Sequence, residues 1–221
     1  MTSFSFVISV TALCALSTLA LAEPTNLQVY KNQLIQYVNS GDYLKEQQSV
    51  TKKASIYLDQ YVAFNQKQVA PKKLAMVLDI DETSLSNYPD MLRLSFGGTL
   101  PEINHDENID NDPVIAPTLA LYNHAKKEGV AVFFITGRAE WLKAHTISNL
   151  KTAGYQQWDG LVFRTKTTMT LPAETYKSAV RKQLVDQGYT IVVNMGDQQS
   201  DLSGGYAEKG FKLPNPFYYI P

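Results

Sequence analysis

The pattern of apolar and polar positions divides the chain into a helical N-terminal part and a longer part with short apolar runs. Between residues 26 and 68, apolar side chains recur every three or four positions, as on one face of an amphipathic helix. Polar and glycine residues at 40–42 interrupt this pattern, so we predict two helices joined by a turn. Pro71 ends the helical region, and we expect residues 23–70 to form a helical arm.

Beyond Pro71, continuous apolar runs are typical of strands that are buried on both faces of a sheet. These runs alternate with helical patterns, which predicts strands at Leu74–Leu78, Val130–Ile135, Leu161–Phe163 and Thr190–Val193 and helices at 116–128, 139–153 and 173–187. Such alternation predicts an α/β fold over residues 71–221, with a doubly wound, mostly parallel, Rossmann-like sheet. Ligands bind beyond the carboxyl ends of the strands in sheets of this kind.

Residues 85–114 fit neither period. They are polar and rich in Asn, Asp, Gly and Pro, and they directly follow the first predicted strand. A loop of this length in a compact domain is more often functional than idle. We therefore predict a small cap insertion at 85–114, lying over the site that the first strand presents.

The first 22 residues contain no charged side chain and end in the sequence Ala20-Leu21-Ala22. This pattern predicts a secretory signal peptide at 1–22, cleaved after Ala22. A membrane anchor is the competing interpretation, because the apolar stretch nearly reaches spanning length. Cleavage would remove Cys14, the single cysteine, and would exclude disulfide chemistry from the mature chain. We expect a periplasmic or secreted protein, without stable membrane association once the peptide is removed.

Composition narrows the range of partners. The formal net charge is −1, and basic residues do not gather into a stripe. Binding to a nucleic-acid polymer is therefore not favoured, and we expect a small-molecule partner. The chain is long enough for one α/β domain with an added arm, and it is compatible with a monomer or an oligomer.

Polar side chains follow three of the predicted strands, at the point where each strand ends. They are Asp79 and Asp81 after the first strand, Thr136 and Gly137 after the second, and Asp197 and Asp201 after the fourth. Because carboxyl ends of parallel strands meet at one edge of a sheet, we expect these groups to converge. Asp79, Asp197 and Asp201 are oxygen ligands without histidine or thiolate, a set that suits Mg²⁺.

This group of residues suits phosphoryl transfer. An Asp carboxylate can attack phosphorus and form an aspartyl-phosphate. The transferred group requires positive charge around its oxygens, which Mg²⁺ and a lysine would supply, and Thr136 and the Gly137 amide can donate hydrogen bonds to it. Asp81 can act as a general acid, because a nearby like charge would help to keep it protonated.

The order of four motifs resembles the haloacid dehalogenase (HAD) superfamily: DIDET (79–83), FFITGR (133–138), YKSAVR (176–181) and VNMGDQQSDL (193–202). More narrowly, the chain resembles the exported acid phosphatases with four signature aspartates, which include class B, class C and plant acid phosphatases. The resemblance extends from about residue 72 to the C-terminal LPNPFYYIP. It implies that Asp79 is the nucleophile and that Asp81 is the acid/base, which also binds the metal through its main-chain carbonyl. It further implies that Thr136 binds the phosphate and that Lys177 neutralises its charge. Asp197 and Asp201 would be the acids on the metal side.

Simpler roles compete with several of these assignments. Glu82 suits a helix cap or a salt bridge, and Thr136 could cap the helix near Ala139. Lys177 could form a surface pair with Glu174, and Asp201 could cap the following turn. Lys166 and Lys182 are the alternatives to Lys177. His105, Tyr88, Phe96 and Trp141 are candidates for substrate contact or for packing, whereas His124 and His145 suit surface or packing roles.

We therefore predict a phosphoric monoester hydrolase, a Mg²⁺-dependent acid phosphatase that hydrolyses small phosphomonoesters outside the cytoplasm. An acidic to near-neutral optimum is expected, since Asp81 must start protonated. The alternatives are a 5′-nucleotidase or a phosphotransferase with the same chemistry, or a catalytically weak binding or storage protein on the same scaffold. A receiver-type switch domain is disfavoured by the export signal, by Asp81 and by the cap.

Overall fold

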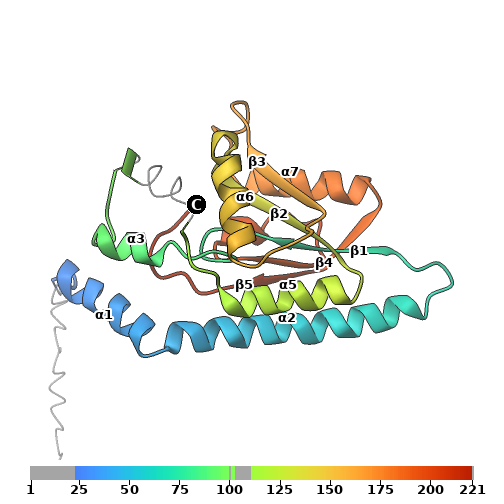
Figure 1. Ribbon diagram of the computed structural model, residues 1–221, viewed down its shortest axis with the longest axis horizontal. Coiled ribbons are helices and arrows are strands. Elements are labelled where there is room, and N and C mark those ends of the chain that lie inside the picture. Colours follow the sequence, from blue (N-terminus) through green and yellow to red (C-terminus); the bar gives the residue numbers. More distant parts are fainter. Residues whose placement is uncertain (1–22, 100, 103–110, 221) are drawn as a thin grey trace, which may run out of the picture.

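A five-stranded parallel sheet lies at the centre of the computed structural model, which describes residues 23–99, 101–102 and 111–220 (Figure 1). The predicted signal peptide, Cys14 and His105 lie outside the described residues. The strands are β1 (Lys73–Leu78), β2 (Ala131–Ala139), β3 (Gly160–Arg164), β4 (Tyr189–Gly196) and β5 (Lys209–Lys212). They pair in the order β3-β2-β1-β4-β5, all parallel. The predicted α/β fold with a parallel sheet is confirmed.

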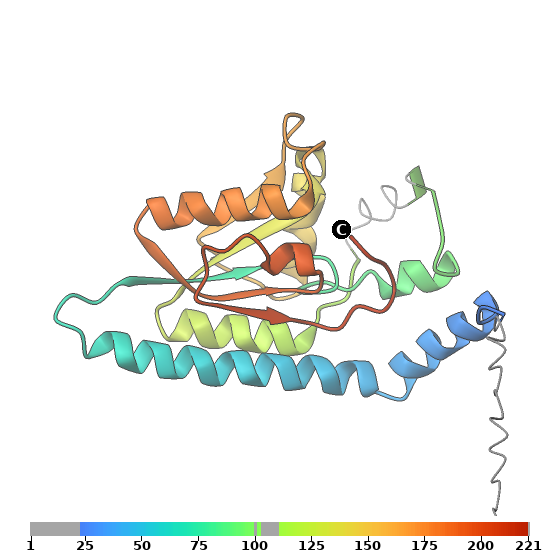
Figure 2. The same ribbon diagram turned by 180° about the vertical axis from the view of Figure 1, so that it is seen from behind.

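Helices cover both faces of this sheet. The helices of the described residues are α1 (Leu27–Asn39), α2 (Asp42–Gln66), α3 (Tyr88–Arg93), α5 (Ala116–Lys127), the 3₁₀ turn η1 (Glu140–Leu142), α6 (Lys143–Thr152), α7 (Ala173–Asp186) and α8 (Gln199–Leu202). The long helix α2 packs along α5 on one face, and α7 lies on the opposite face, as both ribbon views show (Figures 1 and 2).

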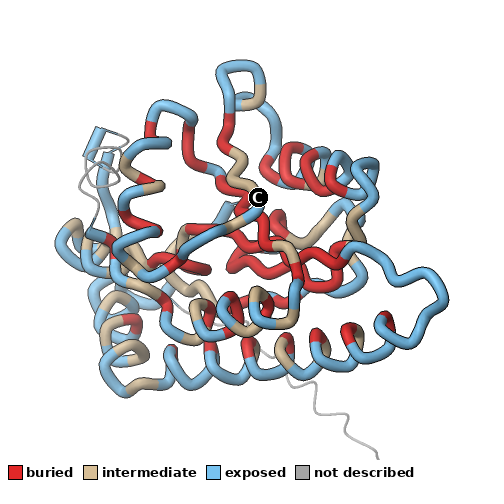
Figure 3. Tube along the Cα trace, turned by 45° about the vertical axis from the view of Figure 1, so that its right-hand side comes forward, coloured by how far each residue is buried: buried red, intermediate tan, exposed pale blue. Residues whose placement is uncertain are grey.

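Strand β1 is buried on both faces, and its alternating side chains serve two cores. Met76 and Leu78 pack with apolar residues of α2 and α5, whereas Ala75 and Val77 pack with residues of α7. The buried part of the chain is accordingly concentrated at the sheet and on the inner faces of the helices (Figure 3). Removing this apolar surface from water stabilises the fold by roughly 25 cal/mol per Å² and holds the end of β1 rigidly.

The helical arm has the predicted break at 40–42. Gly41 adopts φ 80°, a left-handed conformation that glycine tolerates best, directly before α2 begins. On α2, Ala54, Leu58 and Val62 form the buried stripe that contacts the sheet core.

Several boundaries differ from the prediction. β2 and β4 run on to Ala139 and Gly196, so the helix expected from residue 139 begins only at Lys143, after a 3₁₀ turn. The sequence prediction missed β5, because its four residues contain one buried side chain and no apolar run. It also missed α3 within the cap insertion, since this six-residue helix has no buried residue and hence no periodic pattern.

The strand order places the site. From β1 the chain adds β2 and β3 on one side, and then returns to add β4 and β5 on the other side. The carboxyl ends of β1 and β4 therefore lie at the point where the winding reverses, which is where such sheets bind ligands. Asp79 directly follows β1 and Asp197 directly follows β4.

Candidate active site

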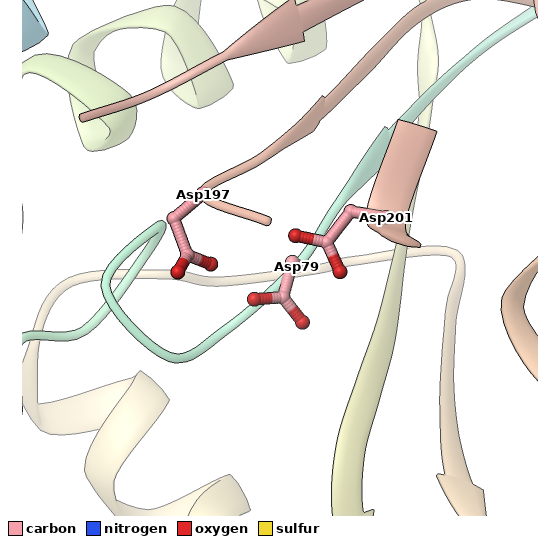
Figure 4. A group of neighbouring side chains, drawn as sticks. All are labelled: Asp79, Asp197 and Asp201. Atoms are coloured by element: carbon pink, nitrogen blue, oxygen red, sulfur yellow. The ribbon is translucent and has the colours of Figure 1, made fainter. Parts of the chain in front are cut away.

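Three buried aspartates meet at this point of the sheet. One carboxylate oxygen from each of Asp79, Asp197 and Asp201 lies within 4.8 Å of the others. Their carboxyl groups gather in one space although they come from β1, from β4 and from α8 (Figure 4). Among the residues that the structure describes, these three aspartates form the group of side chains that lie close enough together to hold a metal ion.

Local structure fixes two of the three. The Asp201 side chain accepts a hydrogen bond from the Gln198 amide at 2.8 Å and so caps the start of α8. A side chain at position 196 would collide with Asp201, so only glycine fits there. Asp197 accepts hydrogen bonds from the side-chain amides of Gln198 at 2.7 Å and Asn215 at 2.6 Å. The predicted capping role of Asp201 is thus present together with its place in the aspartate group.

Lys177 projects from α7 into the same group. Its Nζ donates to Asp79 Oδ1 at 2.6 Å and to Asp201 Oδ1 at 2.5 Å, and its side chain is 7% exposed. The competing role of Lys177, a surface pair with Glu174, is therefore wrong, because Lys177 is buried and pairs with these two carboxylates. Of the two alternatives, Lys182 forms an exposed ion pair with Asp186, and Lys166 is exposed.

The electrostatics of this group leave an excess of negative charge. Burial raises the pKa of Asp79 well above its usual value, and the neighbouring Asp201 and Asp197 add to this effect although Lys177 opposes it. Burial and the charge of Asp201 raise the pKa of Asp197 to about 6. Burial would lower the pKa of Lys177, but Asp79 and Asp201 outweigh it and raise that pKa.

This donor set fits a hard divalent cation. It offers carboxylate oxygens only, and a cation would relieve the mutual repulsion that, after burial, raises the pKa of Asp79 and Asp197. Asp79, Asp197 and Asp201 would hold it. Both oxygens of Asp201 already accept hydrogen bonds, so this residue also orients Lys177.

Asp81 pairs with Arg138 near the end of β2. Arg138 donates to Asp81 Oδ1 from Nε at 3.0 Å and from Nη2 at 2.7 Å. Burial raises the pKa of Asp81, but the charge and hydrogen bonds of Arg138 outweigh burial and lower it below the usual value. The expectation that a like charge keeps Asp81 protonated is therefore wrong for this arrangement, because the dominant neighbour is a cation.

Thr136 and Gly137 lie in β2, next to β1, and not at the start of a helix. Thr136 is fully buried, and its hydroxyl accepts a hydrogen bond from the Arg138 amide at 3.0 Å. The competing role of Thr136 as a helix cap is wrong, because β2 continues to Ala139, and its role as a phosphate ligand stays a prediction. Gly137 is exposed, and a Cβ added there would have no neighbouring atom within 4 Å.

Glu82 completes the turn after β1 without any cation partner among the described residues. It is buried, adopts φ 49°, and accepts hydrogen bonds from the Asn87 amide at 2.6 Å and from the Tyr218 hydroxyl at 2.7 Å. The expected cap or salt bridge is wrong, because these partners come from the cap insertion and from the C-terminal segment. Burial raises the pKa of Glu82 to about 8.

The remaining candidates lie elsewhere or serve packing. Tyr88 and Phe96 pack against Phe217 of the C-terminal segment, with ring centroids 5.4 and 6.0 Å away. Trp141 is 61% exposed. His124 contacts Asp59 between α5 and α2, and His145 is half-buried on α6.

Sequence reasoning missed part of the site. Arg138 stands in the FFITGR motif but had no assigned role, and Asp112, Asn87, Asn215 and Tyr218 were not singled out. An arginine two residues after Thr136, at the end of a strand expected to be buried, was a usable signal, because a buried guanidinium needs carboxylate partners. Asp112, Asn215 and Tyr218 give no local signal, since their contacts join segments far apart in the chain, and Asn87 contacts its near neighbours Asp81 and Glu82 from a stretch without a periodic pattern.

No helix among the described residues is both long enough and apolar enough to cross a bilayer.

Comparison with known proteins points to one family. The model of the HAD superfamily, subfamily IIIB (acid phosphatase), matches residues 7–221. Acid phosphatase 1 of Solanum lycopersicum is 39% identical over 148 residues, which cover 65% of this chain and only 58% of the tomato protein. Vegetative storage protein 1 of Arabidopsis thaliana is 32% identical over 205 residues, covering 90% of this chain and 72% of that protein.

A solved structure shares the fold. The class C acid phosphatase from Bacillus anthracis superposes with a TM-score of 0.71 over 87% of this chain and 86% of that chain, at 21% identity. The predicted HAD-type fold is confirmed by this likeness.

Proposed function

This chain belongs to the HAD superfamily, subfamily IIIB of acid phosphatases, and on that premise we propose that it hydrolyses small phosphomonoesters through a phosphoryl group carried by Asp79, with Mg²⁺ as cofactor. Membership of this family supports the expected enzyme class, the phosphoric monoester hydrolases. One observation carries the finer proposal: Asp79 is buried at the end of β1, in contact with Lys177 and within reach of Asp197 and Asp201.

In the first step an oxygen of Asp79 attacks phosphorus, the ester P–O bond breaks, and the leaving oxygen takes a proton from Asp81. Lys177 is held by Asp79 and Asp201 and offers its charge to the phosphoryl oxygens. Thr136 and the Gly137 amide donate hydrogen bonds to the same oxygens. Bound Mg²⁺ supplies further positive charge to the transferred group.

In the second step a water oxygen attacks phosphorus and gives a proton to Asp81, and the bond to Asp79 breaks to release inorganic phosphate. The ionised Asp81 that Arg138 favours suits this step. The first step needs protonated Asp81, and acidic conditions increase that fraction. This supports an acidic optimum, because the leaving-group proton must come from protonated Asp81, as expected from the sequence.

The division of the chain is also proposed: a signal peptide at 1–22, a helical arm at 23–70 and a phosphatase core at 71–221 with a cap insertion at 85–114. The apolar, uncharged start of the sequence supports action outside the cytoplasm. N-terminal sequencing of the exported protein tests this, and a chain that retains Met1 would contradict it.

The test is phosphate release by the mature chain from aryl, sugar and 5′- and 3′-nucleoside monophosphates, with Mg²⁺ and with EDTA. We expect metal-dependent release that Asp79→Asn abolishes while the circular dichroism spectrum is unchanged. Asp59→Asn, a surface aspartate of α2, is the matched control and should retain activity. Adding an alcohol acceptor separates hydrolysis from phosphotransfer, and the preferred ester decides whether the protein is a 5′-nucleotidase.

A second candidate, a catalytically weak storage or binding protein, rests on the relative named a vegetative storage protein, which is 32% identical to this chain. The presence of Asp79 together with Lys177 argues for turnover. Absence of phosphate release from every ester, by a folded chain that still binds Mg²⁺ in calorimetry, would favour this second candidate.

A further inference from the structure

Arg138 holds one particular oxygen of Asp81. Its side chain is 1% exposed, and both Nε and Nη2 donate to Oδ1 of Asp81. Asn87 Nδ2 donates to the same oxygen at 2.9 Å. The hydrogen bonds that the described residues make to this carboxyl group all end on Oδ1, so the group cannot rotate without breaking three of them.

The same guanidinium reaches both ends of the cap insertion. Its Nη2 donates to Asp112 Oδ2 at 2.9 Å and lies 3.5 Å from Asn87 Oδ1. Asn87 stands near the start of residues 85–114 and Asp112 near their end. Arg138 is therefore the buried cation at which the acid/base carboxyl and the two roots of the cap meet.

The two roots are themselves fixed. The Ser86 amide donates to the Pro113 carbonyl at 2.9 Å, and the Asn149 side chain of α6 makes two hydrogen bonds with the backbone of Asp112, at 2.8 and 3.0 Å. Because Asn149 is 2% exposed, these bonds are shielded from water. Helix α6 therefore fixes the position of Asp112, and through it the position of the Arg138 guanidinium.

We propose that Arg138 is a positioning residue, which fixes Asp81 so that Oδ2 exchanges the proton with the leaving group and ties that orientation to the roots of the cap. This inference rests on the proposed acid/base function of Asp81. A planar fork that binds two carboxylates sets geometry in a way that a point charge such as lysine cannot. The competing role is structural: Arg138 would only neutralise two buried acids.

Leaving-group dependence separates these roles. A p-nitrophenyl group departs without much help from an acid, whereas an alkyl group needs a well-placed proton. For Arg138→Gln and Arg138→Lys we expect kcat/KM for glycerol 2-phosphate to fall about 100-fold, and for p-nitrophenyl phosphate less than about tenfold. Equal losses for the two esters, or no loss for either, would overturn the proposal.

The control is Arg164→Gln, another buried arginine at the end of a strand, whose partners are backbone carbonyls and the Tyr176 ring. It should affect both esters equally. Asn87→Ala, a half-buried position, provides a variant that folds even where the arginine variants do not, and it should show the same ester preference with a smaller, roughly three- to tenfold loss for the alkyl ester.

Asp81→Asn distinguishes the failure of this inference from that of the proposed function. If Asp81→Asn lowers kcat/KM, which reports the steps up to cleavage of the ester bond, equally for both esters, Asp81 is not the acid and its proposed function is wrong. If Asp81→Asn is selective for the alkyl ester but the Arg138 and Asn87 variants are not, only the positioning role fails. If Asp81 is the acid and Arg138 positions it, the double variant Asp81→Asn/Arg138→Gln should have a kcat/KM no lower than that of Asp81→Asn, since Arg138 acts through Asp81.

Discussion

Asp79 and Asp81 stand two residues apart in one turn, and each contacts a buried cation, yet the two pairs differ in almost every other respect. The Asp79 pair (Asp79 with Lys177) shares its lysine with Asp201 and lies among the aspartates that suit a metal. The Asp81 pair (Asp81 with Arg138) shares its arginine with Asp112 at the root of the cap. Adjacent carboxyl groups are thus connected to different parts of the molecule.

The pKa values follow from these partners. The pKa of Asp79 is raised because burial and two further aspartates outweigh one lysine, whereas that of Asp81 is lowered because a two-point contact with Arg138 outweighs burial. The comparison teaches that spacing in the sequence does not assign roles to paired carboxylates. The roles differ because the cation of the Asp79 pair comes from α7, whereas that of the Asp81 pair comes from β2.

Removal of Lys177 should have the largest effect. We expect Lys177→Met to lower kcat/KM about 10³-fold or more, because the phosphoryl oxygens lose their positive partner. Unlike the Arg138 variants, it should slow p-nitrophenyl and alkyl esters alike, since Lys177 does not act on the leaving group.

Lys182→Met is the matched control on the same helix, where an exposed ion pair with Asp186 is lost. It should change the rate less than about twofold, because surface ion pairs contribute little. A loss below tenfold for Lys177→Met, or a loss selective for the alkyl ester, would break the distinction between the two pairs.

The second prediction is that metal binding depends on the aspartates around the Asp79 pair and not on the Asp81 side chain. Mg²⁺ at 100 times its dissociation constant should raise the free energy of unfolding by about 2.7 kcal/mol, measured by urea denaturation with Mg²⁺ and with EDTA. Asp197→Asn should lose this increment, whereas Asp81→Asn, which keeps its main-chain carbonyl, should retain it. An increment that survives in Asp197→Asn would place the cation elsewhere.

The last expected effect concerns the stability of the fold and not the rate, and it involves Glu82, the third carboxyl group of the turn. Its folded-state pKa of about 8 exceeds the ordinary value of 4.5. Between these values the folded chain holds a proton that the unfolded chain releases, so stability is greatest at low pH and decreases by up to about 1.4 kcal/mol per pH unit as the pH rises. Glu82→Gln should remove this contribution.

The measurement is the free energy of unfolding from urea titrations at pH 5, 6 and 7 for the wild type and for Glu82→Gln. Glu174→Gln, on the exposed side of α7, is the control and should leave the slope unchanged. Parallel pH profiles for the wild type and Glu82→Gln would show that the three hydrogen bonds from Asn87 and Tyr218 keep Glu82 ionised.

Much of the architecture could be predicted because its signals are local. Continuous apolar runs marked β1 to β4, and the SGD break at 40–42 marked the turn between α1 and α2. The strand ends then indicated where polar side chains would converge. β5 and α3 escaped prediction because neither buries enough apolar surface to impose a period on its sequence.

By itself, the sequence determined which strands end in carboxylates, and hence that Asp79, Asp197 and Asp201 would meet, because parallel strands present their carboxyl ends at one edge. Only the tertiary structure decided that Lys177 is buried among them, that Arg138 pairs with Asp81, and that Asp112 and Asn215 join from distant segments. A cation-carboxylate contact across 57 or 98 residues leaves no periodic trace in the chain. It depends on how whole helices and strands pack, and that packing fixed the surroundings of each carboxyl group.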